Sequence, residues 1–206
     1  GVDRDAMGNR LEPGDVVTFY DVHETCWSCW HCLVAKASTR CPSRKVYGIT
    51  LGADEGLFGG WAEQIYLRPG TRILPLGKVD PRAFMGGGCG LVTALHAVEQ
   101  ADIRFGDIVL VQGDGPVGLN ALLLAGLKGA TRLIVTGGGG EARRAMAERL
   151  GVDVYLDVLA TTPGERKQAV RDAIGGRGAD VVIEASGAPE AVPEGFRLVR
   201  DAGAYV

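Results

Sequence analysis

The sequence lacks the features that would assign it to a membrane or to nucleic acid. Its longest apolar run, Ala121 to Leu127, is far shorter than the roughly 20 residues that a bilayer-spanning helix needs. The chain opens on polar, turn-rich residues, unlike a secretory signal. The net charge of −3 and the absence of charge blocks give no electrostatic reason to expect nucleic acid or an anionic membrane as partner. We therefore expect a cytoplasmic protein that binds neither.

Glycine, in contrast, is abundant. The 32 glycines among 206 residues are about twice the average share of roughly 7%. They cluster at residues 85–90, 112–118, 136–140 and 175–178. Because glycine is costly to order, an excess indicates that bare backbone is needed in tight turns or against a ligand. The clusters fall between strand-like and helix-like segments, which favours nucleotide-binding loops over disorder.

The two halves of the chain have different patterns. Residues 1–83 carry short strand-like segments at 15–22, 61–67 and 71–76 between turns rich in glycine and proline. Residues 84–206 alternate helical segments with short apolar ones, which is typical of βαβ units and a buried parallel sheet. The predicted fold class is α/β, with one domain in each half. Because the chain begins and ends within strand-like sequence, we expect it to be a piece of a longer protein.

The second half can be divided element by element. Helices are predicted over 91–101, 116–130, 141–151, 165–176 and 191–201, and strands over 107–112, 132–136, 154–158, 180–186 and 203–206.

A G-x-G-x-x-G fingerprint follows the first of these strands. The first glycine allows the sharp exit from the strand, the second lets the backbone approach a pyrophosphate, and the third lets helix and strand pack closely. A proline suits the first helical turn, and the free N–H groups there can receive phosphates. Dinucleotide binding is therefore predicted over a merely structural turn. The residues expected to bind are Gly113, Gly115, Pro116, Val117 and Gly118.

The end of the next strand bears on the choice between NAD and NADP. It runs into Thr136 and Gly137, where NAD-binding proteins carry an acid that accepts from the ribose 2′-hydroxyl. Glu141 comes one helical turn too late. Arg143 and Arg144 could hold a 2′-phosphate, although both could equally be solvated helix residues. We expect Thr136, Gly137 and Arg143 to contact the cofactor, with NADP slightly favoured over NAD.

Four of the five cysteines lie close together in the sequence. Cys26, Cys29 and Cys32 follow C-x2-C-x2-C, and Cys41 comes after eight intervening residues. Four thiolates can enclose a tetrahedral zinc and leave no open position, so such a zinc would be structural. We predict a zinc lobe over about residues 24–45.

Three other roles for these cysteines are less favoured. A disulfide framework fits poorly with a cytosolic chain and an odd number of cysteines. A redox C-x-x-C pair leaves the third and fourth cysteines unexplained. An iron–sulfur cluster is possible with four thiolates, but nothing nearby suggests electron transfer. His23 and His31 are close enough for a mixed Cys/His site, yet both are better explained as loop residues or as hydrogen-bond donors to the ligands.

The fifth cysteine, Cys89, stands alone. A lone cytosolic cysteine is usually a small buried hydrophobic residue. Here glycines at 86–88 and at 90 leave space around the sulfur just before a helix. Because a helix N-terminus favours the thiolate, a chemical role is the stronger hypothesis.

Taken in order, these motifs resemble one family. In order along the chain, the motifs are the four-cysteine lobe, GGWAEQIYL, GCGLVTALHA, GDGPVG and VVIEASGAPEAV. Together they closely resemble the zinc-containing medium-chain alcohol dehydrogenases over the whole chain. The resemblance implies part of a GroES-like β domain at 1–83 and part of a Rossmann domain at 84–206. It also implies a homo-oligomer, dimer or tetramer, that transfers hydride between a small alcohol or carbonyl substrate and NAD(P), with zinc as Lewis acid.

The resemblance also implies roles for individual residues. Cys89 matches one of three protein ligands of a catalytic zinc, and Thr93 matches a residue that contacts the nicotinamide. The loop that lines the nicotinamide side matches Ala185, Ser186 and Gly187, and the structural zinc ligands match Cys26, Cys29, Cys32 and Cys41. The spacing between Cys32 and Cys41 is one residue longer than is usual. Trp27 and Trp30 could face a partner subunit.

Two further catalytic-zinc ligands of the family, a cysteine and a histidine, would lie upstream of residue 1. His96 is not a substitute, and we interpret it as a packed helix residue. The 206 residues alone are therefore expected to be an inefficient enzyme. The alternatives are a non-catalytic dinucleotide-binding module with a structural zinc lobe, and a zinc-independent quinone reductase, which the cysteines disfavour.

Overall fold

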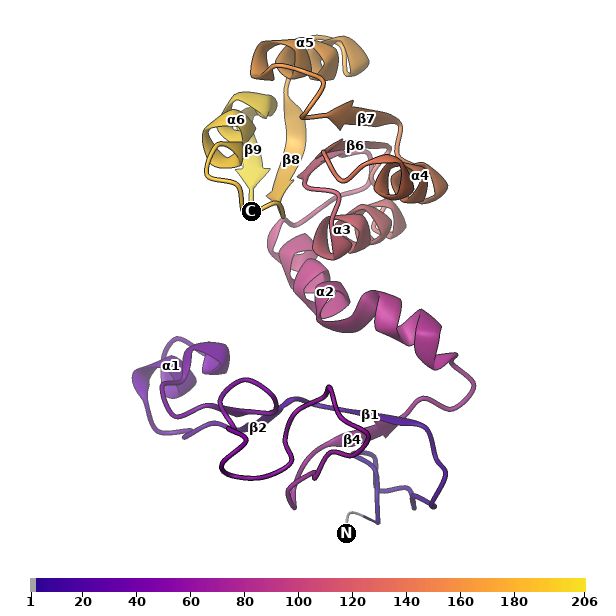
Figure 1. Ribbon diagram of the computed structural model, residues 1–206. Helices are drawn as coiled ribbons and strands as arrows, with labels where there is room; N and C mark the ends of the chain where they lie inside the picture. The colour runs from indigo at the N-terminus through magenta and orange to yellow at the C-terminus, as the bar shows by residue number, and fades with distance from the viewer. Residues whose placement is uncertain (1–2) are drawn as a thin grey trace. The chain divides into compact units, whose positions relative to one another are not determined.

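The computed structural model describes residues 3–206, which fall into two compact units. The first ends at Pro81 and the second runs over Arg82–Val206 (Figure 1).

The first unit contains two small antiparallel sheets. β1 (Val17–Phe19) pairs with β4 (Ile73–Pro75), and β2 (Val22–Glu24) pairs with β3 (Lys45–Val46). The connection between β2 and β3 contains a single turn of helix, α1 (Trp30–Leu33), and a short 3₁₀ turn, η1 (Ser38–Arg40).

The strand predicted over residues 61–67 is wrong. The segment is irregular or extended, and the Tyr66 N–H donates to the carbonyl of Leu57 (2.7 Å) rather than to a strand ladder. Alternating apolar residues indicate that one side of a segment is buried. Here the apolar side chains are buried by packing onto an aromatic cluster and not within a sheet. Ile65 and Leu67 pack against buried residues of that cluster, which are Tyr47, Leu51 and Phe58.

The second unit is a five-stranded parallel sheet in the order β7-β6-β5-β8-β9. Its strands are β5 (Ile108–Gln112), β6 (Arg132–Gly137), β7 (Val154–Asp157), β8 (Ala179–Glu184) and β9 (Val199–Tyr205). The direction in which strands are added changes between β5 and β8, because β6 and β7 lie on one side of β5 and β8 and β9 lie on the other. The carboxyl ends of these strands therefore meet at a topological switch point, where ligands bind in sheets of this kind.

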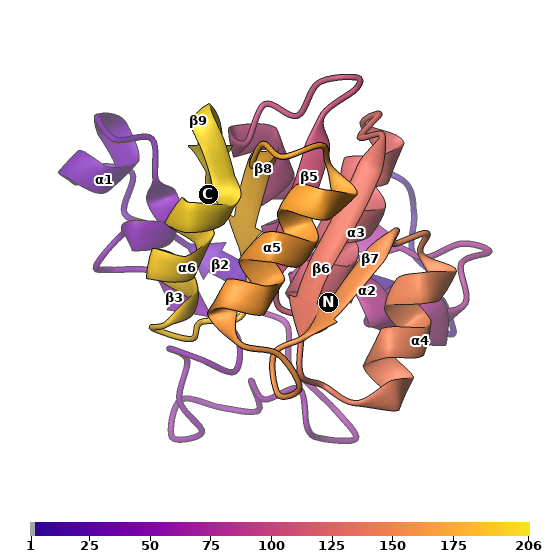
Figure 2. The same cartoon turned by 90° about the horizontal axis from the view of Figure 1, so that it is seen from above.

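Helices cover both faces of this sheet, which gives a doubly wound α/β architecture, as expected of a Rossmann domain (Figure 2). They are α2 (Pro81–Gln100), α3 (Pro116–Leu127), α4 (Glu141–Arg149), α5 (Pro163–Ala173) and α6 (Ala191–Leu198). Alternate strand residues point to opposite faces. Val109 and Val111 of β5 pack with α2, α3 and α4, whereas Leu110 packs with α5 and α6. Burial on both faces explains why the strands read as continuous apolar runs.

Several element boundaries differ from the sequence prediction by a few residues, and two differences have a structural reason. α6 ends at Leu198 and β9 begins directly at Val199, whereas a helix was predicted to Asp201. Arg200 donates to the buried Asp180 carboxylate of β8 (2.6 Å), and this contact across the sheet holds the segment extended. α2 begins ten residues earlier than predicted and is interrupted at Gly88, whose φ of 42° and ψ of −141° are not helical.

Candidate dinucleotide and metal sites

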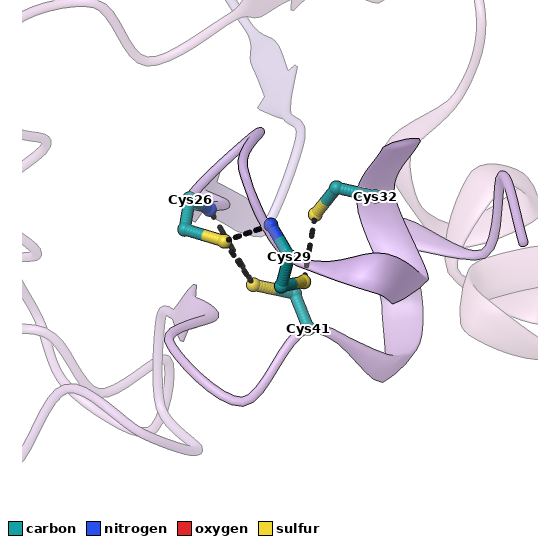
Figure 3. Close-up of side chains that lie close together, drawn as sticks. All are labelled: Cys26, Cys29, Cys32 and Cys41. Atoms are coloured by element: carbon teal, nitrogen blue, oxygen red, sulfur yellow. Dashed lines mark hydrogen bonds between the residues drawn. The ribbon is translucent and has the colours of Figure 1, made fainter. Parts of the chain in front are cut away.

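The four clustered cysteines form one group of sulfur atoms (Figure 3). Their Sγ atoms all lie within 4.8 Å of one another. The Cys29–Cys32 and Cys26–Cys41 sulfur pairs are separated by 3.6 and 3.5 Å. A tetrahedral zinc with Zn–S bonds of about 2.3 Å requires sulfurs about 3.8 Å apart. The donor set therefore fits a closed four-thiolate metal site.

Local backbone geometry directs the sulfurs toward one another. Cys29 precedes α1, which carries the buried Cys32, while Cys41 directly follows η1. The Cys29 N–H donates to Cys26 Sγ (3.3 Å), and the Cys26 N–H donates to Cys41 Sγ (3.4 Å). Such donors favour the thiolate form that a metal requires.

Cys26 and Cys32 differ in acidity. A hydrogen bond from Ser28 lowers the pKa of Cys26 to about 5, whereas burial raises the pKa of Cys32 to about 12. Because a metal-bound thiol is deprotonated outright, metal binding here must displace the Cys32 proton. The two nearby histidines lie outside the sulfur group. His23 contacts Glu24 (3.2 Å), and His31 packs edge-on against Trp30.

The glycine fingerprint lies at the carboxyl end of β5, and its three glycines have different surroundings. A Cβ on Gly113, which has φ 111°, would lie 2.8 Å from the Ser186 nitrogen, and one on Gly118 would lie 1.9 Å from the Gly113 oxygen. A Cβ on Gly115 would meet nothing within 4 Å. The first and third glycines are thus required by packing within the protein, whereas the second borders open space.

That open space is a cavity of about 360 Å³ at the switch point. It is formed by the loops that follow β5, β6 and β8. Of the predicted cofactor residues, seven line it, namely Gly113, Gly115, Thr136, Gly137, Arg143, Ala185 and Ser186. Pro116 and Val117 instead form the first turn of α3, Gly118 packs beneath the loop, and Gly187 lies in the β8–α6 loop beside the lining.

The loop after β8 is held by a carboxylate that sequence reasoning missed. Glu184 accepts hydrogen bonds from Ser186 N (2.7 Å), Ser186 Oγ (2.5 Å) and Gly187 N (2.9 Å). This closes the loop against the cavity. The order acid–x–Ser–Gly at the end of a strand could have indicated such a turn.

A second missed carboxylate stands inside the glycine fingerprint. Asp114 is 4% exposed, and its Oδ2 accepts from Tyr155 Oη (2.7 Å) and Gly139 N (3.0 Å). Its Oδ1 lies 3.6 Å from Arg143 Nη1. Burial raises the pKa of Asp114, but these donors and the arginine charge outweigh burial and leave that pKa below its usual range. Asp114 lines the cavity as an anion.

A third missed feature is a buried ion pair bordering the cavity. Arg166 of α5 donates from Nε and Nη2 to the two carboxylate oxygens of Glu194 on α6 (2.6 and 2.7 Å). Arg166 Nη1 also donates to the Thr161 carbonyl. The two side chains are 6% and 12% exposed. Each belongs to the first turn of its helix, so the pair ties the two helices together at the carboxyl edge of the sheet.

Cys89 follows the break at Gly88 and is exposed, as is Thr93, whose Oγ1 donates to the Cys89 carbonyl (2.9 Å). Neither lines the cavity described above. A Cβ on Gly90 would lie 3.4 Å from Pro116, which is an ordinary van der Waals contact, so packing does not require glycine there. His96 is exposed rather than packed as predicted, because it lies off the face of α2 that buries Ala94 and Val98. Within residues 3–206, the cysteine cage is the one group of three or more close metal-ligating side chains.

The chain was compared with known proteins. Residues 116–206 match the family model described as zinc-binding dehydrogenase. The chain is 33% identical to 5-exo-hydroxycamphor dehydrogenase of Pseudomonas putida, over all of this chain and 56% of that protein. It is 32% identical to erythritol/L-threitol dehydrogenase of Mycolicibacterium smegmatis, over 98% of this chain and 51% of that protein.

Solved structures give the same result. The crystal structure of an alcohol dehydrogenase from Thermotoga maritima superposes with a TM-score of 0.89 at 37% identity, covering 98% of this chain and 56% of that one. The chain thus spans about half the length of the proteins it matches. In the described part of the chain, no helix has both the length and the apolar character needed to cross a membrane.

Proposed function

Because the chain belongs to the zinc-containing medium-chain alcohol dehydrogenases, we propose that it is part of an enzyme that transfers hydride between a small alcohol or carbonyl compound and NAD(P). The observation that carries the proposal is the contrast among the three glycines. Gly113 and Gly118 are glycine because the protein packs against them, whereas Gly115 lines the cavity and a Cβ there would meet nothing within 4 Å. That arrangement leaves bare backbone for a pyrophosphate at the start of α3.

Each part of the cavity then has a role toward a bound dinucleotide. The N–H groups of the first turn of α3 receive the pyrophosphate. The loop at Ala185, Ser186 and Gly187 lines the nicotinamide side, held by Glu184. Gly137 and Arg143 border the adenosine ribose. The nicotinamide ring supplies the hydride chemistry when it is bound.

The two metal functions are proposed separately. The cage of Cys26, Cys29, Cys32 and Cys41 would hold a zinc with no open position, so that zinc shapes the loop and takes no part in the reaction. Cys89 would be one ligand of a second, catalytic zinc, and Thr93 would contact the nicotinamide. Because one ligand cannot hold a catalytic zinc, residues 1–206 alone should retain one tightly bound zinc and turn over poorly. Two zincs per chain together with dehydrogenase turnover would contradict this.

The cofactor preference, the cellular location, the oligomeric state and the partners are proposals as well. The slight preference for NADP now depends on Arg143, because Arg144 pairs with Glu148 (3.1 Å) and does not line the cavity. We also propose a cytoplasmic homo-oligomer, dimer or tetramer, with a small-molecule substrate and with neither nucleic acid nor a membrane as partner. The two relatives named above are dehydrogenases of a hydroxylated terpene and of a sugar alcohol by name, which supports an alcohol as substrate class.

The test is a titration of this chain with NADH followed by its fluorescence, then turnover assays with a panel of alcohols on the zinc-loaded full-length enzyme of which the chain is proposed to be part. Saturable NADH binding and turnover are expected. No binding of NADH or NADPH would refute the proposal. Binding without turnover at full zinc content would instead support a non-catalytic dinucleotide-binding module.

A further inference from the structure

β6 ends at Gly137 without the acid that usually recognises the adenosine ribose. The structure nevertheless places a carboxylate there. A Cβ built on Gly137 would lie 2.4 Å from Cγ and 2.5 Å from Oδ2 of Asp114. The Asp114 side chain, which comes from the neighbouring β5–α3 loop, therefore occupies the space where a side chain at position 137 would begin.

This carboxylate is fixed in place. Tyr155 Oη and Gly139 N both donate to Oδ2, so the group cannot rotate away without leaving two donors unpaired. Gly139 belongs to the loop between β6 and α4 and Tyr155 to β7, so residues from two loops and a third strand, contributed by the neighbouring β5, β6 and β7 segments, converge on one anion. Oδ1 lies 3.6 Å from the Arg143 guanidinium, which is beyond hydrogen-bonding distance, and it retains capacity to accept a hydroxyl.

Exposure decides which of the two charges dominates at this position. The Asp114 side chain is 5% exposed, whereas that of Arg143 is 53% exposed. Water and salt screen an exposed charge far more than a buried one. Arg143 also already faces Asp114, and the negative charge of that carboxylate offsets part of the attraction that Arg143 has for another anion. Arg144 is neutralised locally by Glu148.

We propose that Asp114 makes the site selective for NAD, accepting from the ribose 2′-hydroxyl and repelling the 2′-phosphate of NADP. The inference rests on the proposed dinucleotide function and replaces the expectation drawn from Arg143 alone. Its basis is a fixed, buried carboxylate at the end of β6, supplied by a different loop from the one expected.

The test compares the dissociation constants of NADH and NADPH by fluorescence titration of the protein and two variants. Unaltered protein should bind NADH at least about ten-fold more tightly than NADPH, because like charges in a poorly solvated site repel strongly. Asp114→Asn removes the charge and keeps the size, and should raise NADPH affinity relative to NADH by about ten-fold. Asp172→Asn makes the same charge change at an exposed side chain of α5 outside the cavity and should leave the ratio within about two-fold, because exposed charges are screened.

Each outcome distinguishes the inference from the function on which it rests. If the unaltered protein binds neither cofactor, the proposed function fails. If it binds both equally, or NADPH more tightly, the function stands and the role of Asp114 is refuted. The unaltered protein alone gives this answer, so misfolding of a variant cannot obscure it. An unchanged ratio in a folded Asp114→Asn, or an equal shift in Asp172→Asn, would also refute the role.

Discussion

Replacing two glycines of the same loop by alanine should separate cofactor contact from protein packing. Gly118→Ala places a methyl group 1.9 Å from the Gly113 oxygen, which is backbone and cannot move aside. Overpacking of this kind costs about 1–3 kcal/mol, and the backbone contact places Gly118→Ala at the upper end. Alanine recovers about 1 kcal/mol of helix propensity. The net loss should still lower the melting temperature by several degrees, since 1 kcal/mol corresponds to about 2–4 °C for a chain of this size.

Gly115→Ala should behave differently. A Cβ at Gly115 meets nothing within 4 Å, and its φ of −76° is open to any residue. Losing glycine at the position that caps α3 costs about 1 kcal/mol or less, and the stiffer unfolded chain offsets part of that. Stability should therefore barely change. The added methyl group stands where the pyrophosphate is proposed to approach, so NADH should bind about ten-fold or more weakly, a change of about 1.4 kcal/mol.

The assays are thermal unfolding by circular dichroism and NADH fluorescence titration, applied to both variants and to the unaltered protein. The reasoning predicts a stable Gly115→Ala that binds poorly and a destabilised Gly118→Ala. A Gly115→Ala variant that binds NADH as tightly as the parent would refute the pyrophosphate placement. Equal melting temperatures of the two variants would refute the packing argument.

Three further experiments test other parts of the structure. Cys41→Ser should remove the tightly held zinc, measured by metal analysis, whereas Cys89→Ser should retain it, because Cys89 lies outside the cage. Glu194→Gln leaves the buried Arg166 without its counter-charge and should lower the free energy of unfolding, measured in urea, by about 3–5 kcal/mol. Glu148→Gln breaks an exposed pair and should lower it by less than about 1 kcal/mol. Equal losses would contradict the buried-pair argument. Burial raises the pKa of Asp180, but the Arg200 hydrogen bond, the Ile108 N–H and nearby arginine charges outweigh it and lower that pKa below 3.8. The ionised Asp180 therefore stabilises the fold above pH 3.8, and this stabilisation is lost as pH falls through the lower pKa of the folded state. Asp180→Asn should weaken the pH dependence of the free energy of unfolding in that acid range. An unchanged pH dependence would contradict the assignment.

Much of the second unit could be predicted because its signals are local. Short apolar runs that alternate with helical segments indicate a parallel sheet, and the glycine spacing marks the turn after β5. The first unit was harder to predict, as the irregular segment over residues 61–67 shows. Whether an extended segment becomes a strand depends on finding a partner for its backbone, and that partner is distant in sequence. The boundary between α6 and β9 failed for a similar reason, because the Asp180 contact holds Arg200 extended.

The sequence by itself determined the cysteine group and the glycine loop. Both are built from residues at most fifteen positions apart, so spacing alone carries their chemistry. Only the tertiary structure decided the charge at the end of β6. Asp114 is 25 residues from Gly139 and 41 from Tyr155, and Arg166 is 28 from Glu194. A parallel sheet brings the carboxyl ends of its strands to one edge whatever their separation along the chain. For this reason the position that reads as glycine in the sequence is occupied in space by a carboxylate.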